Sequence, residues 1–262
     1  MMWQLGAFGV LFLALGGGFA WYERKRPDAR IVALVATLAA FAALGRIAFA
    51  ALPNVKPTTD IVLISGYALG GPPGFVVGAL AGLVSNFFFG QGPWTPWQMA
   101  AWGATGMFGG GLARLTRGRI ERGPLALICA VAGFTFAATQ DVGDWVTYSD
   151  HTRAQLAVYV GKGVGFDTVH AAGCLIFAVA FGPALMRSLR RFNTRLQVTW
   201  RPPEVAVPAV IALLAAIGLS PAQARAATPA QYLLGAQNAD GGFPPTPAQA
   251  SSQLISGWAV LG

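Results

Sequence analysis

Polar and aromatic residues gather in three short stretches that interrupt an otherwise apolar chain: 53–60, 90–98 and 140–167. In the last stretch, Asp141 and Asp144 are three residues apart, as are Asp167 and His170, so each pair would share a helix face. Four such groups could form a metal site or a proton relay. No metal is expected, because nothing in the pattern fixes a ligand number or geometry. A hydrogen-bonding rim for a polar ligand and simple solvation of a loop are the two other interpretations.

Several of these residues have a structural interpretation beside the functional one. The tryptophans can anchor the chain at a membrane interface or stack on a ligand. Thr59 and Asp60 can cap a helix. Asn86 lies in an apolar segment, where a partner helix or a ligand must satisfy its amide. Arg46, also in an apolar segment, can extend outward, pair with an Asp or meet an anionic substrate. The candidate substrate-binding residues are Asn54, Lys56, Asp60, Asn86, Gln91, Trp94, Trp97, Gln98, Asp141, Asp144 and Trp145.

Catalytic signatures are missing from the sequence. It contains no nucleophile motif, no P-loop and no H-E-x-x-H, so we expect neither an enzyme nor a cofactor. Cys129 and Cys174 both lie in apolar runs and are expected to be buried small side chains, not metal ligands. A transporter of this kind would take its energy from a partner.

The elements that position these residues must be membrane helices. Hydrophobic residues make up 55% of the 262 residues and charged residues only 11%, whereas a soluble domain is roughly a quarter charged. Thirteen of the eighteen basic residues fall in three stretches, 23–30, 114–122 and 187–201. This is the charge pattern of short cytoplasmic loops in a membrane protein, and it argues against nucleic-acid binding.

Eight apolar segments are candidate spans, measured against the roughly 20 residues that a helix needs to cross a bilayer: 3–22, 31–52, 61–69, 75–89, 97–112, 125–139, 168–185 and 205–219. If the basic stretches lie on one side, an even number of spans separates Arg30 from Arg114. Residues 61–90 must then turn back at Gly70-Gly71-Pro72-Pro73, as two spans or as a re-entrant hairpin.

The predicted fold is therefore all-α, a multi-pass bundle in the cell membrane with its N-terminus and its C-terminal tail outside. The domains are an extra N-terminal helix at 1–22, a six-helix core at 31–195, a final helix and linker at 202–226, and an exported tail at 227–262. Segment 205–219 also has the features of a signal peptide, with small-x-small sites that end at Ala224 and Ala226. The polar groups would gather at the outer mouth of the bundle.

Small residues recur four apart on two segments. Gly74, Gly78 and Gly82 would form a smooth helix face, for which packing inside the bundle is the favoured interpretation. On segment 31–52, alanines form similar faces, which could instead meet a membrane partner. The alanines in question are Ala36, Ala39, Ala40 and Ala43.

The stretch from Leu52 to Gly106, with its NVKPTT and FFFGQGPWTPWQM runs, resembles the substrate-specific (S) component of energy-coupling factor (ECF) transporters. The resemblance extends more weakly over 31–195. It implies a six-helix membrane protein that captures a vitamin or another micronutrient from outside. It also implies docking on a transmembrane coupling protein that carries two ATPase subunits, with the alanine face of the first core helix as the docking surface.

The tail resembles a second family. YLLGAQNADGGF at 232–243 and SSQLISGWAVLG at 251–262 are similar to the first repeat of prenyltransferase and terpene-cyclase-like α/α toroids, with Gly241-Gly242 in a tight turn. A disordered tail is the other interpretation. An exported toroid joined to an S component points, by fold analogy, to cobalamin or a related corrinoid. A membrane-anchored surface protein that displays the toroid, or a membrane isoprenoid enzyme, are the alternative functions.

Overall fold

The computed structural model of this chain describes residues 2–196, 234–244 and 250–252. The chain divides into two units, 1–199 and 200–262, which are treated separately below. The regular secondary structure of the described residues is helical throughout, as expected, with no strand among them.

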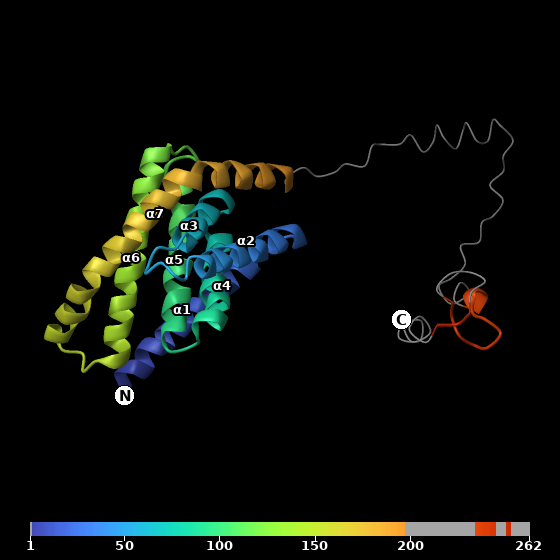
Figure 1. The fold of residues 1–262 in the computed structure, drawn as a ribbon, viewed down its shortest axis with the longest axis horizontal. Coiled ribbons are helices and arrows are strands. Elements are labelled where there is room, and N and C mark those ends of the chain that lie inside the picture. The colour runs from blue at the N-terminus through green and yellow to red at the C-terminus, as the bar shows by residue number, and fades with distance from the viewer. Residues whose placement is uncertain (1, 197–233, 245–249, 253–262) are drawn as a thin grey trace. The chain divides into compact units, whose positions relative to one another are not determined.

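The first unit contains seven helices, shown in Figure 1: α1 (Met2–Arg24), α2 (Ala29–Ala48), α3 (Thr58–Leu69), α4 (Gly71–Phe89), α5 (Trp94–Leu115), α6 (Arg122–Tyr148) and α7 (Arg153–Leu196).

Among the described residues, five helices are long and apolar enough to cross a membrane: Gln4–Arg24, Ala29–Ala48, Gly71–Phe89, Arg122–Tyr148 and Arg153–Phe192. Their outer faces expose large apolar side chains such as Leu13 and Phe87, each more than three-quarters exposed. Exposed apolar surface of this kind suits a hydrocarbon environment. Of the eight predicted spans, five thus lie in helices that are both long and apolar enough, 61–69 and 97–112 lie in α3 and α5, and 205–219 lies outside the described residues.

The predicted break after residue 69 is confirmed. Gly70 has a φ of 103°, which only glycine adopts readily, and α4 then begins with Pro72 in its first turn. The helix before the break, α3, has only twelve residues, about 18 Å at 1.5 Å per residue. It is buried from Thr58 to Tyr67, so neighbouring helices shelter it on all sides.

Glycines bring α3, α4 and α5 into backbone contact. A Cβ atom added at Gly106 of α5 would lie 2.0 Å from the carbonyl oxygen of Gly74 on α4, and one at Gly78 would lie 2.2 Å from that of Trp102. One at Gly66 of α3 would lie 1.9 Å from the Gly106 carbonyl oxygen. The glycine ladder therefore packs inside the bundle. We call the three helices the α3–α5 platform.

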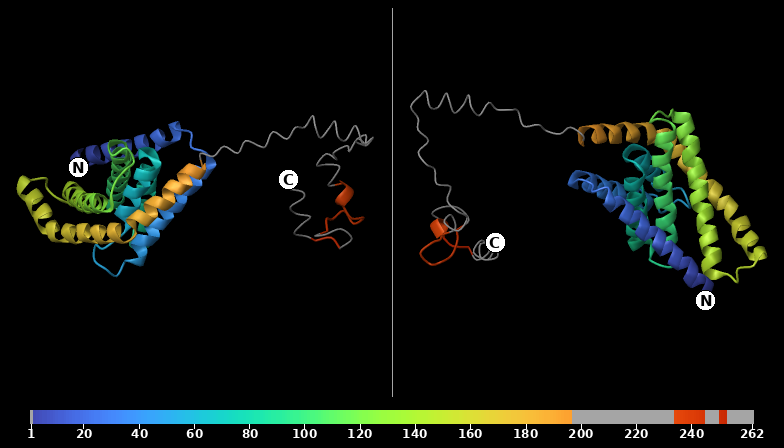
Figure 2. Two further views of the ribbon diagram at one scale, coloured as in Figure 1. Left: turned by 90° about the horizontal axis from the view of Figure 1, so that it is seen from above. Right: turned by 180° about the vertical axis from the view of Figure 1, so that it is seen from behind.

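Helices α6 and α7 form a long hairpin and pack against each other, as the view from behind in Figure 2 shows for the first half of α7. Segment 140–167, interpreted from the sequence as a connection between spans, is helical except at 149–152, because α6 continues to Tyr148 and α7 begins at Arg153. A helix satisfies its own backbone hydrogen bonds, so polar side chains on one face do not end it. The polar residues of this stretch therefore lie on helix faces and not in a loop.

The remaining helices pack on the platform. On α1, Phe19 meets Phe75 of α4 edge to face at 5.7 Å. On α2, Ala39 and Ala43 are buried in the bundle, whereas Ala36 and Ala40 are exposed. Only the second pair is therefore accessible to the docking partner that the resemblance implies.

In the second unit, residues 237–243 form a tight turn. Gly241 has a φ of 79°, and its amide donates to the Asn238 carbonyl at 2.9 Å. Asp240 accepts from the Ser251 hydroxyl at 2.6 Å and from the Gly242 amide at 3.0 Å, and both bonds lower the pKa of its carboxyl. The predicted turn at Gly241 is present. The helices of the toroid repeat fall largely outside the described residues, so the repeat itself stays a prediction.

Candidate functional site

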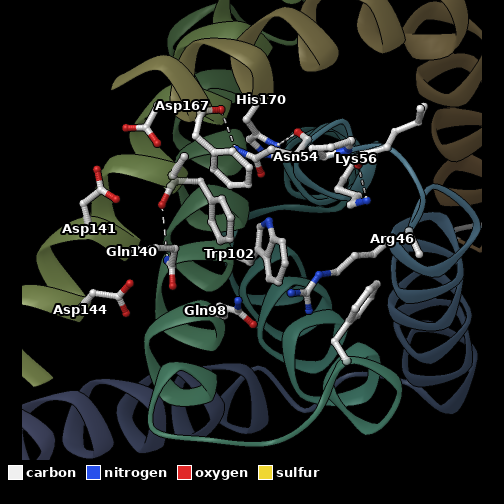
Figure 3. Close-up of a pocket in the computed structure, with 17 residues that line it drawn as sticks. Arg46, Asn54, Lys56, Gln98, Trp102, Gln140, Asp141, Asp144, Asp167 and His170 are labelled. Atoms are coloured by element: carbon white, nitrogen blue, oxygen red, sulfur yellow. Dashed lines mark hydrogen bonds between the residues drawn. The ribbon is translucent and has the colours of Figure 1, made fainter. Parts of the chain in front are cut away.

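A pocket of about 460 Å³ lies between the platform, α2 with the loop that follows it, and the α6–α7 hairpin. Its size is within the range of small-molecule sites, roughly 300–1,000 Å³. Figure 3 shows the basic side chains on one side and the acidic ones on the opposite side, with Trp102 between them. The polar lining residues are Arg46, Asn54, Lys56, Gln98, Gln140, Asp141, Asp144, Asp167 and His170.

A hydrogen-bond chain holds the inner wall of the pocket. The indole Nε1 of Trp102 donates to Thr59 Oγ1 at 3.1 Å, and that oxygen lies 2.9 Å from His170 Nε2. The other ring nitrogen of His170, Nδ1, lies 2.8 Å from the carbonyl oxygen of Asn54. A carbonyl can only accept, so Nδ1 carries the hydrogen and Nε2 of the neutral ring accepts from Thr59. The chain joins α5, α3 and α7.

Arg46 is held at the basic side by two kinds of contact, hydrogen bonds and cation–π contacts. Its Nη1 donates to Ser85 Oγ at 2.7 Å and to Asn86 Oδ1 at 2.6 Å. Its guanidinium carbon lies 4.6 Å from the ring centroid of Phe89 and 5.1 Å from that of Trp102, within cation–π range. Two of the five guanidinium hydrogens are thereby used, and those on Nη2 and Nε remain for an anion.

Asn86 orients Arg46 and one further pocket residue. It is fully buried, and its Nδ2 donates to Thr95 Oγ1 at 3.0 Å and to Gln98 Oε1 at 2.8 Å. Neighbouring helices therefore satisfy the amide completely. Because Gln98 accepts through its oxygen, its own amide hydrogens are available to an acceptor in the pocket. Asn86 positions the site without lining it.

Lys56 lines the pocket on the same side as Arg46. Its Nζ donates to the carbonyl oxygen of Leu52 at 2.8 Å and also to that of Phe49. Burial and the positive charge of Arg46 both lower the pKa of the Lys56 ammonium from its ordinary value. Two cations that lie on the same side of the pocket form a binding place for an anion.

The opposite side carries three carboxylates from the α6–α7 hairpin. Asp141 and Asp144 face the pocket from α6, and Asp167 faces it from α7. Asp167 is only 2% exposed, and its Oδ2 has no hydrogen-bond partner in the part of the chain that the structure describes. The Oδ2 of Asp141 is likewise buried without one. The two buried oxygens therefore lack hydrogen-bond donors, and a cationic group of a ligand could supply them.

Aromatic rings line the space between the two sides. Trp102 and Phe136 stack with centroids 4.2 Å apart and ring planes 14° from parallel. The ring centroids of Phe136 and His170 lie 5.6 Å apart. Flat rings held in this way favour a planar or apolar portion of a ligand over a hydrated one.

Five of the eleven predicted binding residues meet in this pocket: Asn54, Lys56, Gln98, Asp141 and Asp144. The other six lie elsewhere. Gln91 and Trp94 stabilise the turn between α4 and α5 through bonds to the Leu83 and Gly90 carbonyls. Trp145 donates to the Thr152 carbonyl in the α6–α7 turn. Asn86 lies behind Arg46, as described above.

Asp60 and Trp97 are the other two residues outside the pocket. Asp60 is fully buried in α3 beside the thiols of Cys129 and Cys174, and no side chain caps that helix, so the cap interpretation is wrong. Trp97 faces a second, apolar cavity of about 590 Å³ between α1, α5 and α6. Its buried indole Nε1 has no hydrogen-bond partner among the described residues.

The site also uses residues outside the predicted set. Trp102 and Phe136 lie in apolar segments, and nothing in their sequence context separates them from core residues. Asp167 and His170 carried a signal, their spacing of three. Arg46 carried one as well, since a cation inside an apolar span needs a partner.

No group of three or more His, Cys, Asp or Glu side chains in the described residues could hold a metal ion.

No family model, no curated protein and no solved structure matches the chain. The geometry of the pocket therefore carries the functional argument.

Proposed function

We propose that this protein is the membrane-embedded substrate-binding subunit of an importer of the energy-coupling factor type. In this proposal the pocket captures a small vitamin-like molecule from outside, and an ATP-driven partner complex drives its passage inward. The observation that carries the proposal is a polar, charged pocket of about 460 Å³ among helices that are long and apolar enough to cross a membrane. Charged groups among membrane-spanning helices are costly and mark a ligand pathway.

The distribution of basic residues supports the proposed orientation. Arg190 donates to the Gly118 carbonyl at 2.5 Å, so the second and third basic stretches meet at one end of the bundle. Tyr67, near the α3–α4 turn, bonds Thr116 at the same end. The pocket lies toward the opposite ends of α2 and α5. If the basic end is cytoplasmic, the pocket and the N-terminus lie outside. The C-terminal tail would also lie outside if segment 205–219 crosses the membrane, as the sequence predicts.

The volume of the pocket bears on the substrate. A corrinoid is far larger than a typical small vitamin, and a pocket of about 460 Å³ favours the smaller molecule. Cobalamin stays a prediction from the resemblance, and the pocket does not add support to it.

The partner would be a transmembrane coupling protein with two ATPase subunits. Ala36 and Ala40 are exposed and one turn apart on α2, which suits close approach of a second helix. Ala48 is also exposed on α2 but lies off that face, so it offers a matched control.

The test combines binding with uptake. Purified full-length protein in lipid nanodiscs is titrated with a panel of vitamins that includes cobalamin, and uptake is measured in cells that express the coupling proteins. We expect one small vitamin to raise the melting temperature. Ala36→Leu with Ala40→Leu should keep this binding and abolish uptake, whereas Ala48→Leu should keep both. Absence of binding across the panel, or normal uptake by the double variant, would contradict the proposal.

A further inference from the structure

We infer that the ligand of this pocket is a small zwitterion, with an anionic group at one end, a cationic amine at the other and a flat apolar middle. The inference rests on the proposed binding function and specifies its substrate class. It follows from how the charges of the pocket are held apart.

Two cations and three carboxylates line the pocket without pairing. In the part of the chain that the structure describes, neither Arg46 nor Lys56 forms an ion pair with Asp141, Asp144 or Asp167. An unpaired charge in a confined site loses hydration without compensation. Opposite charges that share one pocket would normally relieve this cost by pairing with each other, so the scaffold must prevent it.

Contacts with the surrounding helices keep the basic and the acidic side chains apart. Ser85 and Asn86 hold Arg46 on its side, where it lies over Phe89 and Trp102. On the other side, the Asp141 carboxylate packs against the backbone of α7 at Gly163, where an added Cβ would lie 1.8 Å from Oδ2. Residues outside the pocket thus help to hold Arg46 on one side and Asp141 on the other.

Each side is also incomplete in a specific way. Arg46 retains the hydrogens of Nη2 and Nε, which suit two oxygens of one anionic group. The buried Oδ2 atoms of Asp141 and Asp167 lack donors. Lys162, the cation on the adjoining part of α7, has its Nζ 4.5 Å from the Tyr159 ring centroid and forms no ion pair with these carboxylates.

A ligand with a single charge would complete one side and leave the other unpaired. An anion would lie opposite three carboxylates, and a cation would lie opposite Arg46 and Lys56. A zwitterion of the right length completes both, and Trp102 and Phe136 line the space for its middle. The geometry therefore selects for two opposite charges on one molecule.

The experiment uses three matched probes. Full-length protein in neutral-lipid nanodiscs is titrated calorimetrically at pH 7 with 4-(aminomethyl)benzoate, 4-methylbenzoate and 4-methylbenzylamine. We expect the zwitterion to bind at least tenfold more tightly than either singly charged probe. Equal or tighter binding by a singly charged probe, or no binding by any of the three, would overturn the inference. The proposed function would survive either result if a vitamin from the panel bound and was taken up.

Two variants assign the charges to their sides. Lys56→Gln should lower the affinity for the zwitterion and for the benzoate about tenfold and leave that for the benzylamine within twofold. Asp144→Asn should lower the affinity for the zwitterion and for the benzylamine about tenfold and leave that for the benzoate within twofold. Arg153→Gln, which removes an exposed cation outside the pocket, should change none of the three. If Lys56→Gln lowers the melting temperature, Lys56→Arg retains the charge and must retain the tenfold preference. Equal losses for all three probes in either side's variant would contradict the assignment.

Discussion

The α3–α5 platform and the α6–α7 hairpin meet the pocket from opposite sides, but they are built differently. In the platform, Gly74, Gly78 and Gly106 allow backbone to touch backbone. Where the hairpin meets the platform, contact is made largely by side chains, including the stacked pair Trp102 and Phe136. The platform is continuous, whereas cavities separate parts of it from the hairpin.

This difference divides the work of the site. The platform and α2 fix Arg46, Gln98 and Trp102 through Asn86 and Thr59. The hairpin contributes all three carboxylates. A zwitterion would therefore bridge two parts of the bundle that few hydrogen bonds join directly, and its binding should stabilise their association.

The largest effect is expected from Gly106→Ala, which tests the platform. The new methyl group would collide with the Gly74 carbonyl, and neither backbone can move without separating α4 from α5. Overpacking of this kind typically costs about 1–3 kcal/mol and can exceed that where backbone is involved. Thermal unfolding in mild detergent should show a clear loss of stability.

The matched control is Gly111→Ala, on the same helix, where nothing lies within 4 Å of the added Cβ. Alanine is the better helix former by about 1 kcal/mol, so this variant should be neutral or slightly more stable. Similar melting temperatures for the two variants would mean that the platform is not held by close backbone contact.

A smaller effect is expected from Thr59→Val, which tests the link between the two regions. The substitution removes the acceptor of Trp102 Nε1 and the donor to His170 Nε2. A buried polar group left unpaired costs about 1–3 kcal/mol, but Trp102 and His170 both line the pocket, where water can replace part of the lost hydrogen bonding. Stability should fall, and ligand affinity should fall with it. Thr59→Ser keeps the hydroxyl and should restore most of both, so failure of serine to do so would exclude the hydrogen bonds as the cause.

The sequence predicted the elements of the platform well. Gly70-Gly71-Pro72-Pro73 marked the turn between α3 and α4, because these residues act locally on the backbone. The glycine spacing on α4 predicted close packing for the same kind of reason. Such signals depend on short-range geometry that a single chain segment already contains.

The site was predicted only in part, because its residues come from four distant segments. Asp141 and Asp144 were identified from their spacing, although α6 extends further than expected. Phe136 was missed because an aromatic residue in an apolar helix has the same sequence context whether it packs in a core or faces a ligand. Asn86 was identified as needing a partner, but only the fold shows that its partners are Arg46, Thr95 and Gln98.

The smallest effect is expected from Gly163→Ala, which tests how the hairpin presents its carboxylates. The added methyl group would displace the Asp141 carboxylate, and this costs little because the obstacle is the end of a side chain. Stability should therefore stay close to that of the native protein, while affinity for 4-(aminomethyl)benzoate should change about threefold to tenfold. The matched control is Gly161→Ala, about half a turn away on α7. A Cβ added there has nothing within 4 Å, so this variant gives the same change in helix propensity without moving Asp141. If calorimetry gave equal affinities for the two variants, the position of Asp141 would not matter for binding, and the cationic end of the ligand would have to lie against Asp144 and Asp167 alone.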